Sequence, residues 1–517
     1  MTKTDSRTSK SIKNSSVALV FYFINLILQF FSRKIFLDYL GAEVLGLNTT
    51  AQNLLGFLNI AELGIGTAIS YNLYKPIFEN DRDTINNIIS IQGWLYRKIA
   101  SVVIIGSCAL MLFFPVIFSK AQVPIWYTYG SFVALLTSSL LGYFVNFKQI
   151  LLSAAQKEYK ITCCVKGGMA LKVIMQILAI RFFSEGYEIW MLIEILSAFA
   201  ISWVLDRTVR KEYPWLCPIV SDGQMLSKRY PQIIIKTKQL FFHKIAGFVL
   251  SQTSSLIIYG YASLTLVASY GNYMLIILGV SSLMNALLNG INAGIGNLVA
   301  EGNFLKIKMT FWKITFVRMW IASAICFTIY MAGDLFISLW VGEQFVLPRG
   351  AFVILIINAF ITMTRTNDAF LAAYGLYQDI WAPIAEAMLN LGLSVLLGYY
   401  WGLEGILTGV LISLLIIIYG WKPYFLYKNG FKDRLSEYVW KYIKYISVIL
   451  VSFFVCVRLL NMCVYDMDNT YYRCLFCCVV SFSIYVLVSI FLFCCIDAYP
   501  RLFMIWIYDT FQRKIVK

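Results

Sequence analysis

Long apolar runs dominate the chain, and short polar or charged segments separate them. An apolar helix of about 20 residues crosses a bilayer. The runs are longer than the alternating ten-residue segments of a membrane barrel, which favours helices over strands. We therefore predict an all-α polytopic membrane protein with about fourteen transmembrane helices. They lie near residues 15–37, 45–70, 90–118, 124–147, 161–183, 188–206, 239–261, 268–299, 312–333, 349–373, 380–400, 404–422, 441–461 and 473–496.

The composition agrees with a membrane protein and excludes a soluble one. Hydrophobic residues make up 60% of the 517 residues, charged residues make up 14%, and the mean hydropathy is +0.72. Soluble domains are roughly 45–50% apolar and about 25% charged. The chain therefore has too few charged residues to cover a surface that faces water.

The net charge of +16 is an orientation signal. With the N-terminus placed in the cytoplasm, 34 of the 43 Lys and Arg residues fall in cytoplasmic segments and 7 on the opposite side. Only Lys172 and Arg365 remain inside spans. Because cytoplasmic loops are rich in Lys and Arg, we predict that both termini are cytoplasmic. The basic residues are not gathered on one soluble face, which excludes a nucleic-acid partner.

Other sequence features exclude several classes of protein. The first apolar run reaches Phe31 without a small-residue cleavage site, so it is predicted to be a retained span. The 12 Cys residues lie mostly in or beside apolar runs and suggest no disulfide framework. Cys474 and Cys477 have the spacing of a redox or metal pair, but no second pair or nearby His accompanies them. No P-loop is present, and we expect neither a cofactor nor an enzymatic activity.

Two internal echoes suggest a duplicated six-helix bundle. A shift of 230 residues places Gly64-Ile65-Gly66 on Gly294-Ile295-Gly296, and a shift of 218 places Ala154-Ala155 on Ala372-Ala373. Parallel repeats of this kind occur in secondary transporters, which bind substrate between the halves. The predicted divisions are a first lobe of helices 1–6 at 1–211, a basic cytoplasmic linker at 212–238, a second lobe of helices 7–12 at 239–427, and helices 13–14 with a cytoplasmic tail at 428–517.

Three segments carry a resemblance to a known family. The first comprises SRKIFLDYLGAE at 32–43, LGLN at 45–48, AELGIGTA at 61–68 and LYKP at 73–76. The second comprises HKI at 243–245 and YGNY at 270–273, and the third comprises PIAE at 383–386 with Asn390, Ser394, Gly402, Gly405 and Gly409. With these segments the chain resembles the Wzx-type lipid-linked oligosaccharide flippases of the multidrug/oligosaccharidyl-lipid/polysaccharide (MOP) exporter superfamily.

The resemblance implies a flippase of the bacterial inner membrane. Its substrate would be an undecaprenyl-pyrophosphate-linked oligosaccharide, moved from the cytoplasmic to the outer leaflet for O-antigen, capsule or another surface polysaccharide. Polymerases or other polysaccharide-assembly proteins would be its partners. Relatives often carry an acidic residue where this chain has Thr253-Ser254-Ser255, and Gly-Thr where it has Gly409-Val410. Two alternatives remain, namely a cation-coupled multidrug exporter of the same superfamily and a membrane polysaccharide polymerase or ligase.

A flippase for a charged headgroup needs cations and polar groups inside the membrane, where ionisable residues usually mark functional sites. Structural roles explain several candidates about as well. Arg33 and Lys34 can reach the outer interface, and Arg365 can pair with Asp368 one turn away. His243 can lie at the cytoplasmic interface. The candidate substrate-binding residues are Arg33, Lys34, Asn48, Glu62, Lys172, Arg365, Asp368, Glu386 and Asn390, and the candidate gating or coupling residues are His243 and Lys244.

Overall fold

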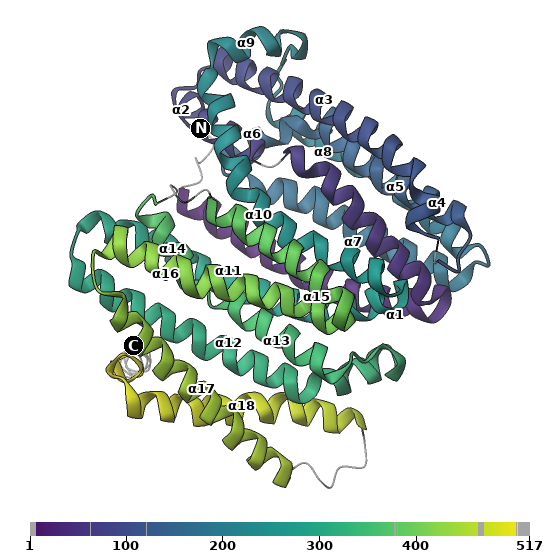
Figure 1. Cartoon of the computed structure of the whole chain (residues 1–517). Helices are drawn as coiled ribbons and strands as arrows, with labels where there is room; N and C mark the ends of the chain where they lie inside the picture. Colours follow the sequence, from purple (N-terminus) through teal and green to yellow (C-terminus); the bar gives the residue numbers. More distant parts are fainter. Residues whose placement is uncertain are drawn as a thin grey trace. The chain divides into compact units, whose positions relative to one another are not determined.

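A computed structural model of the chain describes residues 7–62, 64–119, 121–376, 379, 381–463, 470–502 and 504. These residues are almost entirely helical and include no strand (Figure 1). Helices satisfy their backbone hydrogen bonds internally, as a segment inside hydrocarbon must. The prediction of an all-α membrane protein is confirmed.

The chain divides into two compact units. Unit 1 is Met1–Ala268 and unit 2 is Ser269–Lys517. α11 (Leu264–Glu301) begins in unit 1 and continues into unit 2. The four-part division expected from the sequence stays a prediction.

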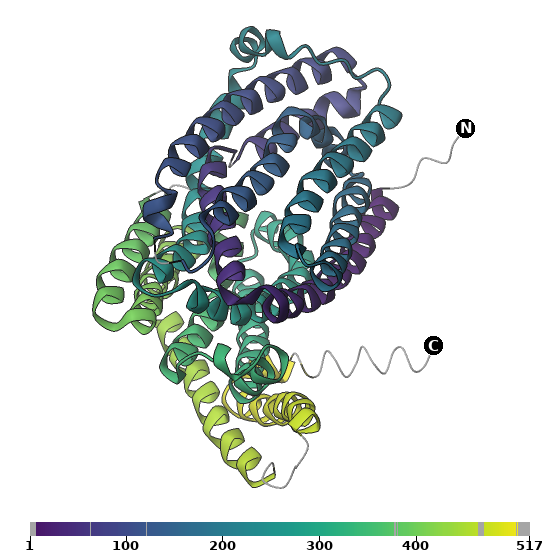
Figure 2. The same cartoon turned by 90° about the vertical axis from the view of Figure 1, so that its right-hand side faces the viewer.

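In unit 1 the long helices lie side by side, with α7 packed between α1 and α8, and α5 packed on α3 and α8 (Figure 2). The elements of unit 1 are α1 (Arg7–Leu58), η1 (Asn59–Glu62), α2 (Ile65–Glu79), α3 (Arg82–Leu112), α4 (Phe114–Ile117), α5 (Ile125–Phe144), η2 (Asn146–Gln149), α6 (Ile150–Ala154), α7 (Glu158–Phe182), α8 (Gly186–Glu212), η3 (Val220–Asp222), α9 (Gly223–Arg229) and α10 (Pro231–Tyr261).

In unit 2, α12 packs against α13, α17 and α18, and α13 packs against α15 (Figure 1). The elements of unit 2 after α11 are α12 (Phe304–Trp340), η4 (Glu343–Phe345), α13 (Arg349–Met363), α14 (Thr366–Ala373), α15 (Trp381–Leu414), η5 (Leu415–Trp421), α16 (Lys422–Leu426), η6 (Tyr427–Phe431), α17 (Leu435–Cys463) and α18 (Thr470–Ile496).

The helices correspond to the expected spans once two kinks are considered. Among the described residues, ten helices are long and apolar enough to cross a membrane, or eleven with the bent pair α5 and η2–α6. α1 and α15 each contain two helices joined at a glycine with positive φ, Gly41 at 82° and Gly402 at 57°. Only glycine adopts such a conformation without strain. Counting both kinked helices as pairs gives thirteen spans, and α10 corresponds to the fourteenth expected one.

Spans four and ten are both interrupted helices, which extends the second sequence echo. Span four bends by 61° between α5 and the η2–α6 segment, and α6 ends at Ala154. Span ten breaks between α13 and α14, and α14 ends at Ala373. The two alanine pairs that match in sequence thus follow equivalent breaks. Discontinuous helices in corresponding positions of two repeats are typical of secondary transporters.

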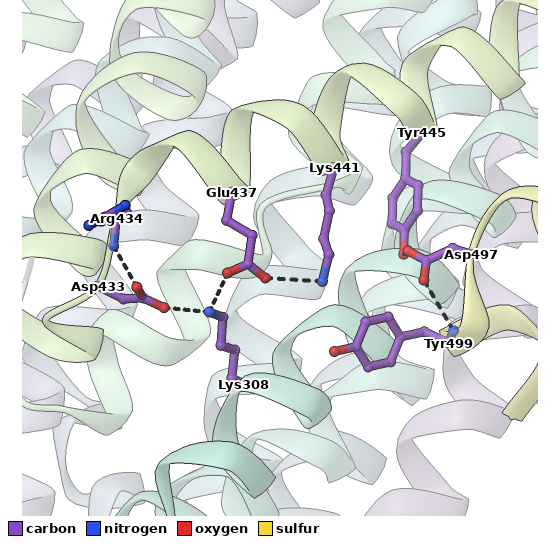
Figure 3. Close-up of polar contacts among 8 residues, drawn as sticks. All are labelled: Lys308, Asp433, Arg434, Glu437, Lys441, Tyr445, Asp497 and Tyr499. Atoms are coloured by element: carbon purple, nitrogen blue, oxygen red, sulfur yellow. Dashed lines mark hydrogen bonds and ion pairs between the residues drawn. The ribbon is translucent and has the colours of Figure 1, made fainter.

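A charged cluster fastens the last two helices to α12 in unit 2 (Figure 3). The Lys308 ammonium on α12 bonds the carboxylates of Asp433 and Glu437, and Glu437 also pairs with Lys441 at 3.1 Å. The Lys308 ammonium holds the pKa of Asp433 below its ordinary value. Further along α17, the Tyr445 hydroxyl donates to the carboxylate of Asp497, just after α18, at 2.8 Å. These contacts, together with buried aromatic rings on α12 and α17, bind α17 and α18, the last two expected spans, to the rest of unit 2.

The two halves of α15 cross so closely that glycine is required at the crossing. A Cβ atom at Gly409 would lie 2.4 Å from the backbone nitrogen of Ser394 on the first half. We expect Gly409→Ala to lower the free energy of unfolding by about 1–3 kcal/mol, because the two backbones must separate. Thermal unfolding of the detergent-solubilised protein, followed by tryptophan fluorescence, measures the effect.

Gly392→Ala is the matched control on the same helix, because a Cβ there meets no atom within 4 Å. It should be neutral or slightly stabilising, since alanine favours helix more than glycine does. Equal destabilisation by both substitutions would contradict the close crossing.

Candidate functional site

The four candidates in the first two spans do not form one cluster. The Arg33 guanidinium donates to the backbone oxygen of Ala268 at 3.0 Å. Lys34 pairs with Asp38 at 3.4 Å, and both side chains are almost half exposed. Buried Asn48 accepts a hydrogen bond from the Tyr187 hydroxyl at 2.9 Å. Each of these residues therefore has its own partner within unit 1.

Glu62 lies at a break in span two. It ends the short helix η1, and α2 begins after Gly64, whose φ is 94°. The Glu62 carboxylate accepts a hydrogen bond from the Tyr96 hydroxyl of α3 at 3.0 Å. Asn59, one turn earlier, accepts from the Tyr143 hydroxyl at 2.9 Å. The break thus places a carboxylate and an amide beside two tyrosines of neighbouring helices.

Lys172 forms a buried ion pair beside a polar cavity in unit 1. Its ammonium on α7 lies 2.7 Å from the carboxylate of Glu194 on α8, and these side chains are 18% and 5% exposed. The Gln176 amide donates to the other Glu194 oxygen at 2.9 Å. A cavity of about 200 Å³ lies between α5, η2, α7 and α8, and Lys172, Glu194, Asn146 and Gln149 are among its lining residues. An ionic and amide lining of this kind can hold water or a polar group.

A second charged cluster in unit 2 brings together three of the candidates. Arg365 lies at the break between α13 and α14. Its guanidinium lies 2.9 Å from the carboxylate of Asp368 and 3.5 Å from that of Glu386 on α15. Lys422 bonds the other oxygen of Asp368 at 2.6 Å. The arrangement connects α14, α15 and α16 through alternating charges.

Asn390 extends this polar region one turn further along α15. It is fully buried, and neither atom of its side-chain amide bonds another described residue. The Glu386 oxygen that faces Arg365 has no closer hydrogen bond to a described residue, and this side chain is 2% exposed. Buried polar groups are almost always hydrogen-bonded in native proteins. The unpaired groups of Asn390 and Glu386 therefore keep hydrogen-bonding capacity that no described residue uses.

The sequence predictions missed three charged residues that the structure buries, namely Glu194 and Lys422 of these clusters and Arg318 of α12. Glu194 is an acid inside span six, and a search for in-span acids as well as Lys and Arg would have found it. Lys422 and Arg318 were counted as cytoplasmic loop residues, but the structure buries both side chains in unit 2. Hydropathy did not reveal this burial, because α12 and the helix after Gly402 continue past the hydrophobic segments visible in the sequence. The assignment of these two cations to the cytoplasmic side stays a prediction.

His243 and Lys244 belong to α10, but their side chains lie outside the described residues. A gating or coupling role for them stays a prediction. Across the described ranges, no group of three or more His, Cys, Asp or Glu side chains could hold a metal ion. Chemically, both clusters offer cations, carboxylates and amides, which suit the binding of a charged or hydroxylated group.

The folded chain is similar to two solved transport proteins. One is lipid II flippase MurJ in an inward closed conformation, with a TM-score of 0.62 and 12% identity over 96% of this chain and 99% of that one. The other is an inward-facing multidrug resistance MATE family transporter of the MOP superfamily, with a TM-score of 0.59 and 15% identity over 82% of this chain and 98% of that one. No protein-family model and no curated protein matches the sequence.

The chain therefore has the fold of MOP-superfamily transporters, as its resemblance in sequence implied. Both similar structures are transport proteins by name. With its many apolar helices, the chain is a multi-pass membrane protein.

The Lys172–Glu194 pair generates a prediction about stability. Removing one partner of a buried ion pair leaves an uncompensated charge and costs about 3–5 kcal/mol, whereas removing both costs much less. We expect Lys172→Gln and Glu194→Gln each to lower the thermal unfolding temperature in detergent, and the double variant to unfold near the wild-type temperature. A double variant as unstable as the two single losses combined would show that the two side chains act independently.

Proposed function

We propose that the chain is a flippase for an undecaprenyl-pyrophosphate-linked oligosaccharide, which it moves from the cytoplasmic to the outer leaflet of the bacterial inner membrane. The product would supply O-antigen, capsule or another surface polysaccharide. The observation that carries the proposal is the similarity to lipid II flippase MurJ over nearly the whole of both chains. The sequence resemblance to Wzx-type flippases names the same kind of substrate independently.

The length of the match favours a flippase over a drug exporter. The MATE transporter leaves 18% of this chain without a counterpart, since it covers 82%, whereas MurJ leaves 4%. The last two expected spans, which are α17 and α18, account with the tail for about a sixth of the chain. The contacts between α12, α17 and α18 make these two helices an integral part of unit 2.

The charged clusters suit the proposed substrate. A pyrophosphate headgroup is anionic, and Arg and Lys side chains form strong charge-assisted hydrogen bonds with phosphate oxygens. Lys172 beside its cavity and Arg365 at the helix break supply such cations away from the loops. We propose that the two lobes move by alternating access, with Arg33, Lys34, Asn48, Glu62, Lys172, Arg365, Asp368, Glu386 and Asn390 along the route.

The membrane potential can drive the proposed movement. A pyrophosphate-linked headgroup carries about two negative charges. An inside-negative potential favours its outward movement by about 2.3 kcal/mol per charge per 100 mV. The potential therefore contributes roughly 4–5 kcal/mol at 100 mV. A coupled proton or sodium ion is not required by this energy balance. The direction assumes cytoplasmic termini, as the distribution of Lys and Arg predicts.

A multidrug exporter is the second candidate, because a MATE family transporter has the same fold. Drug resistance on overexpression, with unchanged surface glycans, would favour it. A polymerase or ligase is disfavoured, since such enzymes need a large outer loop. The expected outer segment near 334–349 is only a short loop in the structure, because α12 continues to Trp340 and α13 begins at Arg349. Asp334 pairs with Arg349 at 2.8 Å.

Flipping in reconstituted vesicles tests the proposal. The double variant Lys172→Gln/Arg365→Gln should flip an undecaprenyl-pyrophosphate-linked oligosaccharide about tenfold or more slowly than the wild type, because each cation offers a charged hydrogen bond. The protein should remain in the membrane. Lys75→Gln/Lys306→Gln, which removes one exposed cation from each unit, is the matched control and should flip at the wild-type rate.

A balanced variant separates transport from stability. Lys172→Gln/Glu194→Gln leaves no buried unpaired charge, so it should keep its stability and still lose flipping. Full flipping by both the balanced variant and Lys172→Gln/Arg365→Gln would contradict the assignment of these cations to the route. No flipping by the wild-type protein would contradict the proposed function.

A further inference from the structure

Arg318 is a buried arginine that forms no ion pair with any described residue. It lies on α12, 14 residues after the helix begins at Phe304, which corresponds to about 21 Å along the axis. Arg318 is 8% exposed, and its Nε atom bonds no described residue. No carboxylate in the described part of the chain lies within ion-pair distance of its guanidinium. An unpaired charge in the interior of a membrane protein is costly and usually functional.

The neighbouring cations are already neutralised. Arg365 pairs with Asp368 and Glu386, and Lys422 pairs with Asp368. The guanidinium of Arg318 lies within electrostatic range of Asp368, but that carboxylate bonds the other two cations. Three cations thus face two carboxylates.

Asp379, the other buried acid of this region, does not restore the balance. It accepts a hydrogen bond from the Trp421 indole at 3.3 Å and forms no ion pair with Arg318 among the described residues. The cluster of Arg318, Arg365, Lys422, Asp368 and Glu386 therefore keeps one positive charge in excess.

Unpaired hydrogen-bonding groups accompany this excess charge. Thr315, one turn before Arg318 on α12, is 1% exposed, and its hydroxyl bonds no described residue. Thr366, the first residue of α14, is 2% exposed, and its hydroxyl is equally unpaired within the described chain. α12 and α14 pack against each other, and α14 also carries Asp368.

We propose that Arg318 is the residue that receives a phosphate or pyrophosphate group in unit 2, with the hydroxyls of Thr315 and Thr366 as further donors. This inference deepens the proposed function and rests on it for the identity of the anion. An oxyanion supplies the negative charge that the cluster lacks and accepts hydrogen bonds from groups that have no partner. Arg365, which is itself proposed to lie along the route, and Lys422 also hold Asp368 and Glu386 in place. The same chemistry fits three sources, namely a lipid-linked pyrophosphate, a bilayer phospholipid and free pyrophosphate.

Binding to the purified full-length protein tests this assignment. The wild type should bind undecaprenyl pyrophosphate about tenfold or more tightly than undecaprenol, and Arg318→Gln should abolish the difference. Arg318→Lys should retain most of it, since the charge remains. Lys313→Gln is the matched control, because Lys313 lies on the same helix and is partly exposed. It should bind as the wild type does.

Parallel measurements with phosphatidylglycerol and inorganic pyrophosphate identify the source of the anion. Tightest Arg318-dependent binding of undecaprenyl pyrophosphate assigns the site to the lipid-linked headgroup. Tightest Arg318-dependent binding of either of the other two supports an anion site with that ligand instead. Each result requires that thermal unfolding of Arg318→Lys stays close to that of the wild type.

Equal binding by wild type and Arg318→Gln would overturn the inference. So would an equal loss in Arg318→Lys and Arg318→Gln with lowered unfolding temperatures, because that result indicates a packing role. Flipping separates this outcome from the proposed function. If the wild type binds the anion through Arg318 but does not flip the lipid, only the proposed flippase function is contradicted. If the wild type flips the lipid while Arg318→Gln binds the anion normally, only the assignment of Arg318 is contradicted.

Discussion

A charge inside hydrocarbon must be paired or hydrated, and the interior of this protein is organised by that requirement. In unit 1, Lys172 meets Glu194 at the edge of a polar cavity. In unit 2, Arg365 and Lys422 share Asp368, and Arg365 also faces Glu386. The positive charges of Arg365 and Lys422 are balanced by these two carboxylates, whereas the positive charge of Arg318 has no ion-pair partner among the described residues. The same requirement explains why so few charges enter the spans and why those that do are informative.

Hydropathy predicted the helices well, because one physical rule governs them. Backbone groups in hydrocarbon must bond within a helix, so long apolar runs can form little else. Details of the breaks depended on single residues. Gly41 and Gly402 turn the chain between adjacent spans through positive φ angles, whereas the interruption at Arg365 has no glycine or proline signal in the sequence.

The site was predicted only in part. Arg365 and Asp368 form the i,i+3 pair that their spacing suggested, and Glu386 joins them from α15, which the sequence did not predict. The role of this cluster in substrate binding stays a prediction. Arg318 and Lys422 could not be placed in the same way, since a cation near the end of an apolar run can face a loop or the interior. Tertiary packing decides between these outcomes, and hydropathy does not record it. For Arg33 and Asn48, the partners Ala268 and Tyr187 come from long-range contacts that no spacing rule predicts. The pair of Lys34 with Asp38 has the i,i+4 spacing of a helix ion pair.

The central claim is that this protein carries an anionic lipid headgroup across the membrane on a small set of buried cations. The dependence of flipping on an imposed potential tests it most directly. Vesicles containing the wild-type protein and an undecaprenyl-pyrophosphate-linked oligosaccharide should flip faster when the destination side is made positive, and an uncharged undecaprenol-linked glycan should not respond. Flipping that is absent at every potential, or equal for the charged and uncharged lipids, would contradict the account.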